Sequence, residues 1–163
     1  MKTVEQSTST RHYQCSMKTK IFALSFIAYV VITFIFAAGW HLVLFKETYD
    51  ALGIFTRKEP IIPLGLISMA IQGVLLPYLY SYFYTGGTPW KVGLSFGLIV
   101  GVLLASVAVF AEAGKNEVSS LTTWLVLESI YYLVQFGVVG IVLGMLFGRI
   151  QLPNSEQYKN IRA

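Results

Sequence analysis

The stretch LTTWLVLESIYYLVQFGVVGIVLGMLFG, residues 121–148, decides the fold of this chain, because its only charged side chain is that of Glu128. A transmembrane helix needs about 20 consecutive, mostly apolar residues, and this stretch is longer than that. Three stretches without Asp, Glu, Lys or Arg precede it, at 21–45, 60–90 and 92–111. The pattern predicts an all-α integral membrane bundle of four transmembrane helices, with spans at about 21–45, 62–84, 91–111 and 120–148.

The composition agrees with a membrane protein and excludes several other classes. Of the 163 residues, 55% are hydrophobic and 12% are charged, and the mean hydropathy is +0.65. Soluble domains carry roughly a quarter charged residues, and four spans leave no room for a soluble catalytic unit. The net charge of +4 comes from residues that flank the spans, so we expect the lipid bilayer and not a nucleic acid as partner.

The lysine and arginine residues between the spans predict the orientation of the chain. If the N-terminus is cytoplasmic, the cytoplasmic segments hold eight of them and the outer loops hold four. The eight are Lys2, Arg11, Lys18, Lys20, Lys91, Arg149, Lys159 and Arg162, and the four are Lys46, Arg57, Lys58 and Lys115. Both termini are therefore predicted to be cytoplasmic. We expect a disordered tail at 1–19, a transmembrane domain at 20–150 and a polar tail at 151–163.

An alternative interpretation makes residues 1–39 a cleaved signal peptide, with Ala37, Ala38 and Gly39 as the cleavage site. The apolar core of a signal peptide is typically about 7–15 residues long. Here the apolar run continues through Leu42–Phe45, which favours a retained first helix. The single cysteine, Cys15, lies in the N-terminal tail and can form no internal disulfide. It is interpreted as an inert thiol, with reversible acylation as the alternative.

Helix boundaries are predicted from proline, glycine and serine residues. Gly53 is expected to cap an extension of the first helix, and Pro77 is expected to kink the second. The remaining signals are Pro63 and Thr88-Pro89 for helix starts, Ser119 or Ser120 for the cap of the last helix, and Pro153 for its end.

Small residues recur at every fourth position on the last two spans. The third span carries Gly93, Gly97, Gly101 and Ala105, and the fourth carries Gly140, Gly144 and Gly148. Such ladders let two helix backbones approach closely. They are predicted either to pack against each other or to form the seam of a homo-oligomer. On a helical wheel of the fourth span, its glycine ladder lies opposite a stripe formed by Trp124, Glu128, Tyr131 and Gln135.

Polar groups from all four helices are also predicted to lie in the outer half of the bundle, although the sequence does not determine whether they meet. Glu128 lies roughly 12 Å inside the last span, and an ionisable group at such a depth is a candidate functional site. Three interpretations remain open: an interhelical hydrogen bond, a ligand or ion pocket that opens outward, and a proton relay. The candidate ligand-binding residues are Glu128, Gln72, His41, Tyr131, Gln135 and Trp40.

Motifs for enzyme chemistry are absent from the sequence. We find no H-E-x-x-H, G-x-S-x-G or phosphate-loop pattern, and no paired metal ligands. We therefore expect no catalytic residues, no metal site, no cofactor and no enzymatic activity. The series Ser25, Tyr29, Thr33, Ala37 and His41 winds about 160° around the first helix, which favours packing over a pore-lining face.

One stretch carries a family resemblance. The residues Gly39-Trp40-His41, Leu44-Phe45, Tyr49 and Leu52-Gly53 form a pattern that resembles small four-span bacterial membrane proteins in a family of unknown function. The short second loop and the glycine-rich last helix look similar as well. The resemblance implies a bacterial inner-membrane protein and marks Trp40 and Tyr49. Many relatives have Tyr or Leu where this chain has His41.

Together these patterns lead to one functional hypothesis with two alternatives. The chain is expected to bind a small apolar or lipid-like ligand in an outward-facing polar pocket between the helices. One alternative is an accessory membrane subunit that associates through the glycine ladders. The other is a minimal transporter that assembles as a dimer, although no inverted repeat is evident.

Overall fold

The computed structural model describes residues 2–54, 59 and 61–161, and this part of the chain is helical without strands. The elements in chain order are α1 (Lys2–Ala37), η1 (Ala38–Leu44), α2 (Lys46–Leu52), α3 (Ile62–Phe83), α4 (Pro89–Ala105), η2 (Ser106–Ala111) and α5 (Leu121–Ile161). The two η segments are π-helical turns that continue α1 and α4.

Four helices are long and apolar enough to cross a membrane, which confirms the predicted fold class. Their spans are Thr19–Leu44, Ile62–Phe83, Pro89–Ala111 and Leu121–Arg149. Large apolar side chains are exposed along these spans, among them Val43 at 74% and Leu103 at 63%. Since such residues face lipid at no cost, the chain is a multi-pass integral membrane protein.

Most predicted helix boundaries agree with the structure. Gly53 has φ 73° and caps α2, a conformation that glycine adopts without strain. Pro63 and Pro89 lie in the first turns of α3 and α4, and Pro77 lies inside α3. Ser120 Oγ accepts a hydrogen bond from Thr123 N at 3.4 Å and so caps α5.

At both ends of the chain the helices extend beyond the predicted spans. α1 begins at Lys2, where a disordered tail at 1–19 is expected, and α5 continues to Ile161 through Pro153. The sequence from 2 to 37 contains no Gly or Pro, so no residue there breaks a helix that already exists. Proline removes one backbone donor but does not always end a helix.

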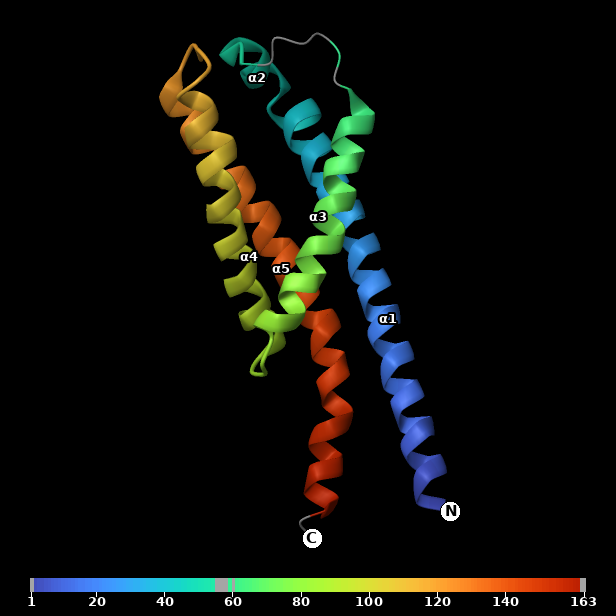
Figure 1. The fold of residues 1–163 in the computed structure, drawn as a ribbon. Helices are drawn as coiled ribbons and strands as arrows, with labels where there is room; N and C mark the ends of the chain where they lie inside the picture. The colour runs from blue at the N-terminus through green and yellow to red at the C-terminus, as the bar shows by residue number, and fades with distance from the viewer. Residues whose placement is uncertain (1, 55–58, 60, 162–163) are drawn as a thin grey trace.

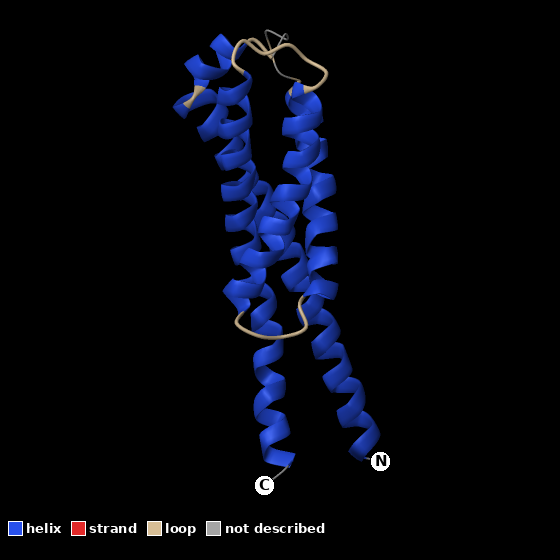
Figure 2. Ribbon diagram, turned by 90° about the vertical axis from the view of Figure 1, so that its left-hand side faces the viewer, coloured by secondary structure: helices blue, strands red, loops and turns tan. Residues whose placement is uncertain are grey.

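The helices form two pairs. α1 packs on α3, and α4 with η2 packs on α5, while the short α2 lies across one end of the bundle. The start of α1 and the end of α5 both project from the opposite end of the bundle, apart from each other (Figure 1). The turn between α3 and α4 is also at that end, as the side view shows (Figure 2). We call the end that α2 covers the α2 end.

The glycine ladders of α4 and α5 pack against each other within one chain. A Cβ added at Gly97 would lie 2.1 Å from Phe136 O, and one added at Gly140 would lie 2.2 Å from Gly93 O. A Cβ at Gly144 would likewise lie 2.2 Å from Pro89 O. The absence of side chains therefore brings the two backbones into direct contact. Of the two predicted uses of the ladders, the structure shows the intramolecular one.

Two hydrophobic clusters fill the bundle. The larger one lies toward the middle and includes Tyr29, Tyr80, Phe96 and Phe136. The smaller one lies at the α2 end and consists of Tyr49, Leu52, Ala105, Val109 and Trp124. The smaller cluster joins α2 to α4, η2 and α5, and it supports the polar site described below.

We expect Gly140→Ala to destabilise the protein by about 1–3 kcal/mol, because the new methyl group overpacks the seam against Gly93 O and the Gly97 backbone. Gly65→Ala is the matched control, since a Cβ at Gly65 meets nothing within 4 Å. Its effect should stay within about 0.5 kcal/mol. Unfolding of the purified protein with increasing SDS measures both. Equal effects of the two variants would contradict the close approach of α4 and α5.

Candidate functional site

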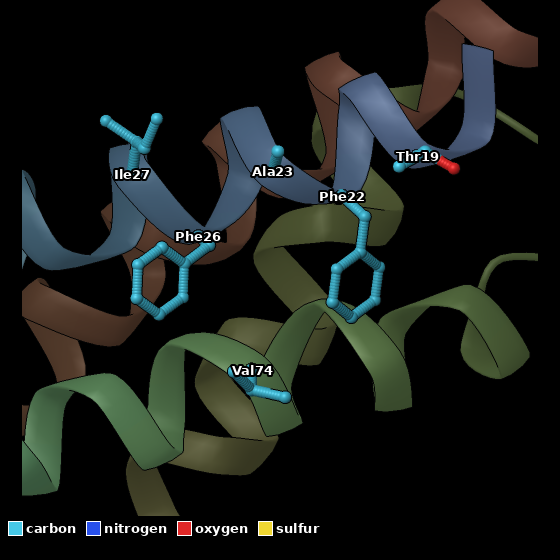
Figure 3. A pocket seen from close by; sticks show the side chains of 6 residues that line it. All are labelled: Thr19, Phe22, Ala23, Phe26, Ile27 and Val74. Atoms are coloured by element: carbon cyan, nitrogen blue, oxygen red, sulfur yellow. The ribbon is translucent and has the colours of Figure 1, made fainter. Parts of the chain in front are cut away.

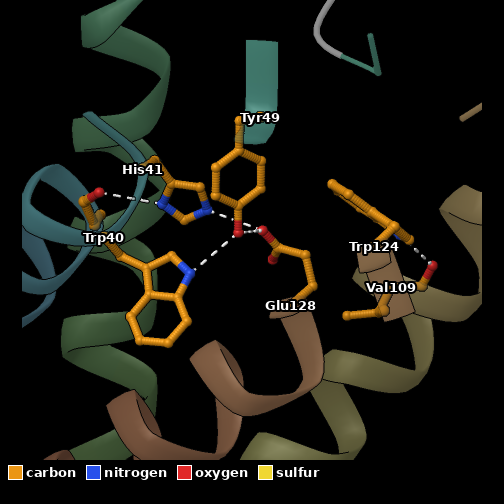
Figure 4. A network of polar contacts seen from close by, with 7 residues as sticks. Trp40, His41, Tyr49, Val109, Trp124 and Glu128 are labelled. Atoms are coloured by element: carbon orange, nitrogen blue, oxygen red, sulfur yellow. Dashed lines mark hydrogen bonds and ion pairs between the residues drawn. The ribbon is translucent and has the colours of Figure 1, made fainter. Parts of the chain in front are cut away.

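Glu128 is the centre of a hydrogen-bonded cluster at the α2 end. The Glu128 residue is only 4% exposed. His41 Nε2 lies 3.0 Å from Glu128 Oε1, and the Tyr49 hydroxyl donates a hydrogen bond to the same oxygen. Trp40 Nε1 donates in turn to the Tyr49 hydroxyl at 3.1 Å (Figure 4). The intramembrane carboxyl group is thus paired, as a buried ionisable group must be.

The tautomer of His41 follows from its second contact. His41 Nδ1 lies 3.1 Å from the Ala37 carbonyl oxygen, which can only accept, so Nδ1 carries a hydrogen. The contact between Nε2 and Glu128 Oε1 then requires one more proton. That proton makes either an imidazolium with a carboxylate or an imidazole with a carboxylic acid. In both forms the pair shares one proton and has no net charge.

Tyr49 reaches the cluster from outside the membrane spans. It lies on α2, which folds back over the bundle, and it is 3% exposed. Burial, together with the hydrogen bond to Glu128, raises the pKa of the Tyr49 hydroxyl above its ordinary value. The hydroxyl therefore keeps its proton and remains a donor to Glu128.

Two π-helical turns flank the cluster. η1 carries Trp40 and His41, and the backbone N–H of Phe45 donates to Trp40 O at 3.0 Å across its wide turn. η2 carries Val109, whose carbonyl oxygen accepts a hydrogen bond from Trp124 Nε1 at 3.1 Å. Such turns are rare and occur frequently at functional sites.

A pocket of about 490 Å³ opens beside Glu128. Trp124, Ile54 and Ala108 form part of its wall. Its polar lining consists of His41, Glu112, Asn116, Glu128, Tyr131 and Tyr132. Contacts between described residues give Glu128 Oε2 no hydrogen-bond partner. The pocket therefore presents an unused acceptor to whatever enters it.

The structure brings together only some of the predicted site residues. Glu128, His41 and Tyr131 line the pocket, and Trp40 lies behind them, with its ring centroid 5.8 Å from that of Tyr131. Gln72 and Gln135 are not in the pocket lining. Gln72 accepts from the Tyr29 hydroxyl and donates to Ser68 Oγ at 3.1 Å, and Gln135 Nε2 donates to Thr33 Oγ1 at 3.3 Å.

Two aromatic residues of the site, Trp124 and Tyr49, are absent from the predicted ligand-binding residues. Trp124, which the sequence places on the stripe that includes Glu128, is 4% exposed and lines the pocket. Its indole N–H is held by Val109 O, which keeps the ring inside. Tyr49 is absent from the predicted ligand-binding residues because it lies between spans. The signal that could have found it is its place in the Trp40–Gly53 pattern.

A second, larger groove lies between α1 and α3 and has different chemistry. It measures about 730 Å³ and is lined by Thr19, Phe22, Ala23, Phe26, Ile27 and Val74. Figure 3 shows Phe22 and Phe26 of α1 above α3. This lining is almost entirely apolar and lies on a membrane span, so lipid chains can fill it. It offers no group for selective recognition.

No group of three or more His, Cys, Asp and Glu side chains in the described part of the chain is arranged to hold a metal ion. Comparison with known proteins adds no assignment, because no protein-family profile, curated protein or solved structure matches the chain. The site has to be interpreted from its own geometry.

We expect Tyr49→Phe to destabilise the protein by about 1–3 kcal/mol, because Glu128 loses a donor and Trp40 Nε1 loses its acceptor. Tyr82→Phe is the matched control, since Tyr82 is 69% exposed and its hydroxyl bonds only to that of Tyr78. Its effect should be within about 0.5 kcal/mol. SDS unfolding measures both variants.

A double-mutant cycle tests whether the effect passes through Glu128. In a Glu128→Gln background the Tyr49→Phe change should cost less, with a coupling energy of about 0.5–3 kcal/mol. Strictly additive effects would contradict the hydrogen bond between the two side chains.

Proposed function

We propose that this protein binds a small amphiphilic ligand, with an apolar body and a polar end, in the pocket beside Glu128, without catalysing a reaction on it. The observation that carries the proposal is the unpartnered Glu128 Oε2 on the wall of a pocket. This oxygen is not fully buried, so a polar group that enters the pocket can reach it. A ligand with a hydrogen-bond donor would pair with it in place of water.

The size and lining of the pocket support this proposal. Small-molecule sites are usually about 300–1,000 Å³, mostly apolar, and contain a few polar groups that orient the ligand. The pocket is about 490 Å³ and combines the aromatic rings of Trp124, Tyr131 and Tyr132 with the polar ends of Glu128 and Asn116. The rings would hold the body of the ligand, and the carboxyl group would hold its polar end.

Orientation in the membrane determines where the ligand comes from. The excess of Lys and Arg on the other side of the spans favours an outward-facing α2 end, with both termini in the cytoplasm. The pocket at that end would then receive ligands from outside the cell. A bacterial inner membrane is the location that the family resemblance favours.

The alternative role as an accessory subunit loses its main support. It depends on free glycine ladders, but Gly93, Gly97, Gly140 and Gly144 already form the seam between α4 and α5. A partner subunit or a second copy would have to use another face of the bundle. Ligand binding within the single chain needs no such face.

Cysteine labelling in whole cells tests the proposal. In a Cys15→Ser background we expect Ala108→Cys, on the pocket wall, to react with a membrane-impermeant thiosulfonate added outside. Val107→Cys, on the adjacent residue that is 59% exposed toward lipid, is the matched control and should react at least about tenfold more slowly, since thiol reactions need the hydrated thiolate. The probe 2-phenylethanol should slow labelling of Ala108→Cys. Equal rates at the two positions, or no protection by the probe, would contradict the proposal.

A further inference from the structure

The two oxygens of the Glu128 carboxyl group have different surroundings. Oε1 lies 3.0 Å from His41 Nε2 and accepts the hydrogen of the Tyr49 hydroxyl. Oε2 makes no hydrogen bond to a described residue and is not fully buried, so the pocket reaches it. Because Glu128 lines the pocket, this free oxygen defines the position of a donor atom on the ligand.

The groups around the pocket favour a donor with a positive charge. Glu112 is a second carboxylate in the lining, and its partner Lys115, 3.4 Å away, has a side chain that is 67% exposed. None of the described residues that line the pocket is Lys or Arg. The rings of Trp124, Tyr131 and Tyr132 lie in the same wall, and ring faces attract cations within about 6 Å.

We infer that the ligand is an organic cation whose protonated amine donates a hydrogen bond to Glu128 Oε2, in exchange for the proton that His41 and Glu128 share. The inference rests on the proposed function, because it names the chemical class of the ligand in the same pocket. The ammonium group lies at Glu128, and the apolar body of the ligand lies against the aromatic wall.

The exchange of the shared proton for the cation follows from the need to keep the buried site neutral. The pair of His41 and Glu128 holds one shared proton and no net charge. A bound ammonium adds one positive charge at a site of low dielectric, where an uncompensated charge is costly. When the shared proton leaves to water, the hydrogen bond between His41 Nε2 and Glu128 Oε1 is broken, and the ammonium and the Glu128 carboxylate form a neutral pair. One cation enters and one proton leaves, so the total charge is conserved.

The other titratable groups around the pair do not replace this proton. Tyr49 on α2 donates its hydrogen to Glu128 and keeps it. Tyr131 and Tyr132 on α5 are neutral phenols near neutral pH. Glu112, at the end of η2, is paired with Lys115 and Asn116. The shared proton is therefore the one that a cation displaces.

Other ligand charges fit the pocket less well. An anionic head group would face the carboxylates of Glu112 and Glu128, and like charges at such an interface cost affinity. A bare metal ion would find no group of three suitable side chains among the described residues. An aromatic wall is suited to an organic cation.

Calorimetric titration of the full chain in lipid nanodiscs tests the inference, with empty nanodiscs as the control for partition into lipid. Three probes of similar size differ in charge: phenethylammonium, 2-phenylethanol and phenylacetate. We expect phenethylammonium to bind about 10- to 100-fold more tightly than 2-phenylethanol, because the hydrogen bond from its ammonium group to Glu128 joins two charged groups. Phenylacetate should bind most weakly.

Proton release is measured by repeating the titration in phosphate and in Tris, whose ionisation enthalpies differ. We expect about one proton to be released per amine bound, and the affinity for the amine to rise when the titration is repeated over a range of increasing pH. The sign follows from mass action, because a binding step that releases a proton is favoured when protons are scarce. The affinity for 2-phenylethanol should not change over this range.

Two variants separate the role of the Glu128 carboxylate from the effect of negative charge elsewhere on the protein. Glu128→Gln should remove the preference for the amine and the proton release. Glu47→Gln, the matched control at an exposed carboxylate of α2 outside the pocket lining, should keep both. If Glu128→Gln does not fold, the affinities of the wild-type protein for the three probes still decide whether the pocket prefers a cation.

The outcomes distinguish the inference from the proposed function. Equal affinities for amine and alcohol would overturn the inference and leave the proposed function standing. Tighter amine binding without proton release would overturn the exchange. Failure of all three probes to bind would overturn the proposed function and the inference together.

Discussion

The direct contact between the backbones of α4 and α5 is the constraint on which the rest of the structure depends. Three spaced glycines on each helix remove the side chains that would otherwise hold the axes apart. Because the two helices are then fixed against each other, η2 lies beside the start of α5. Trp124 can reach Val109 O only in this arrangement. The same contact thus builds one wall of the pocket beside Glu128.

The second pair of helices is joined to this unit through polar groups. α1 supplies Thr33 to Gln135 of α5, and η1 supplies His41 to Glu128. α2 adds two ties at its own end, since Ser119 N donates to Leu52 O at 3.1 Å and Ser119 Oγ donates to Ala51 O at 2.7 Å. Within the membrane such polar contacts have no water to compete with them, and they fix which helix faces are neighbours.

The sequence was sufficient for the spans but only in part for the site. Span positions follow from charge-free length, which is a property of each segment alone, and they agree with the structure within a few residues. His41 and Glu128 were both candidate residues because each lies in the outer half of its span, but the sequence did not determine that they meet. Gln72 was predicted at the same depth, yet it bonds to Tyr29 on α1. Depth can be counted along one helix, whereas the order of helices around the bundle depends on contacts that no single segment encodes.

The positions of the indole rings have a spectroscopic consequence. Two of the three tryptophans, Trp40 and Trp124, lie at the α2 end beside Glu128, and their N–H groups are hydrogen-bonded inside the protein. The third, Trp90, is at the opposite end in the first turn of α4 and is 47% exposed. Replacing Trp90 with Phe would leave a protein whose tryptophan fluorescence arises only beside the pocket. The chain thus carries its own optical reporter of what occupies that site.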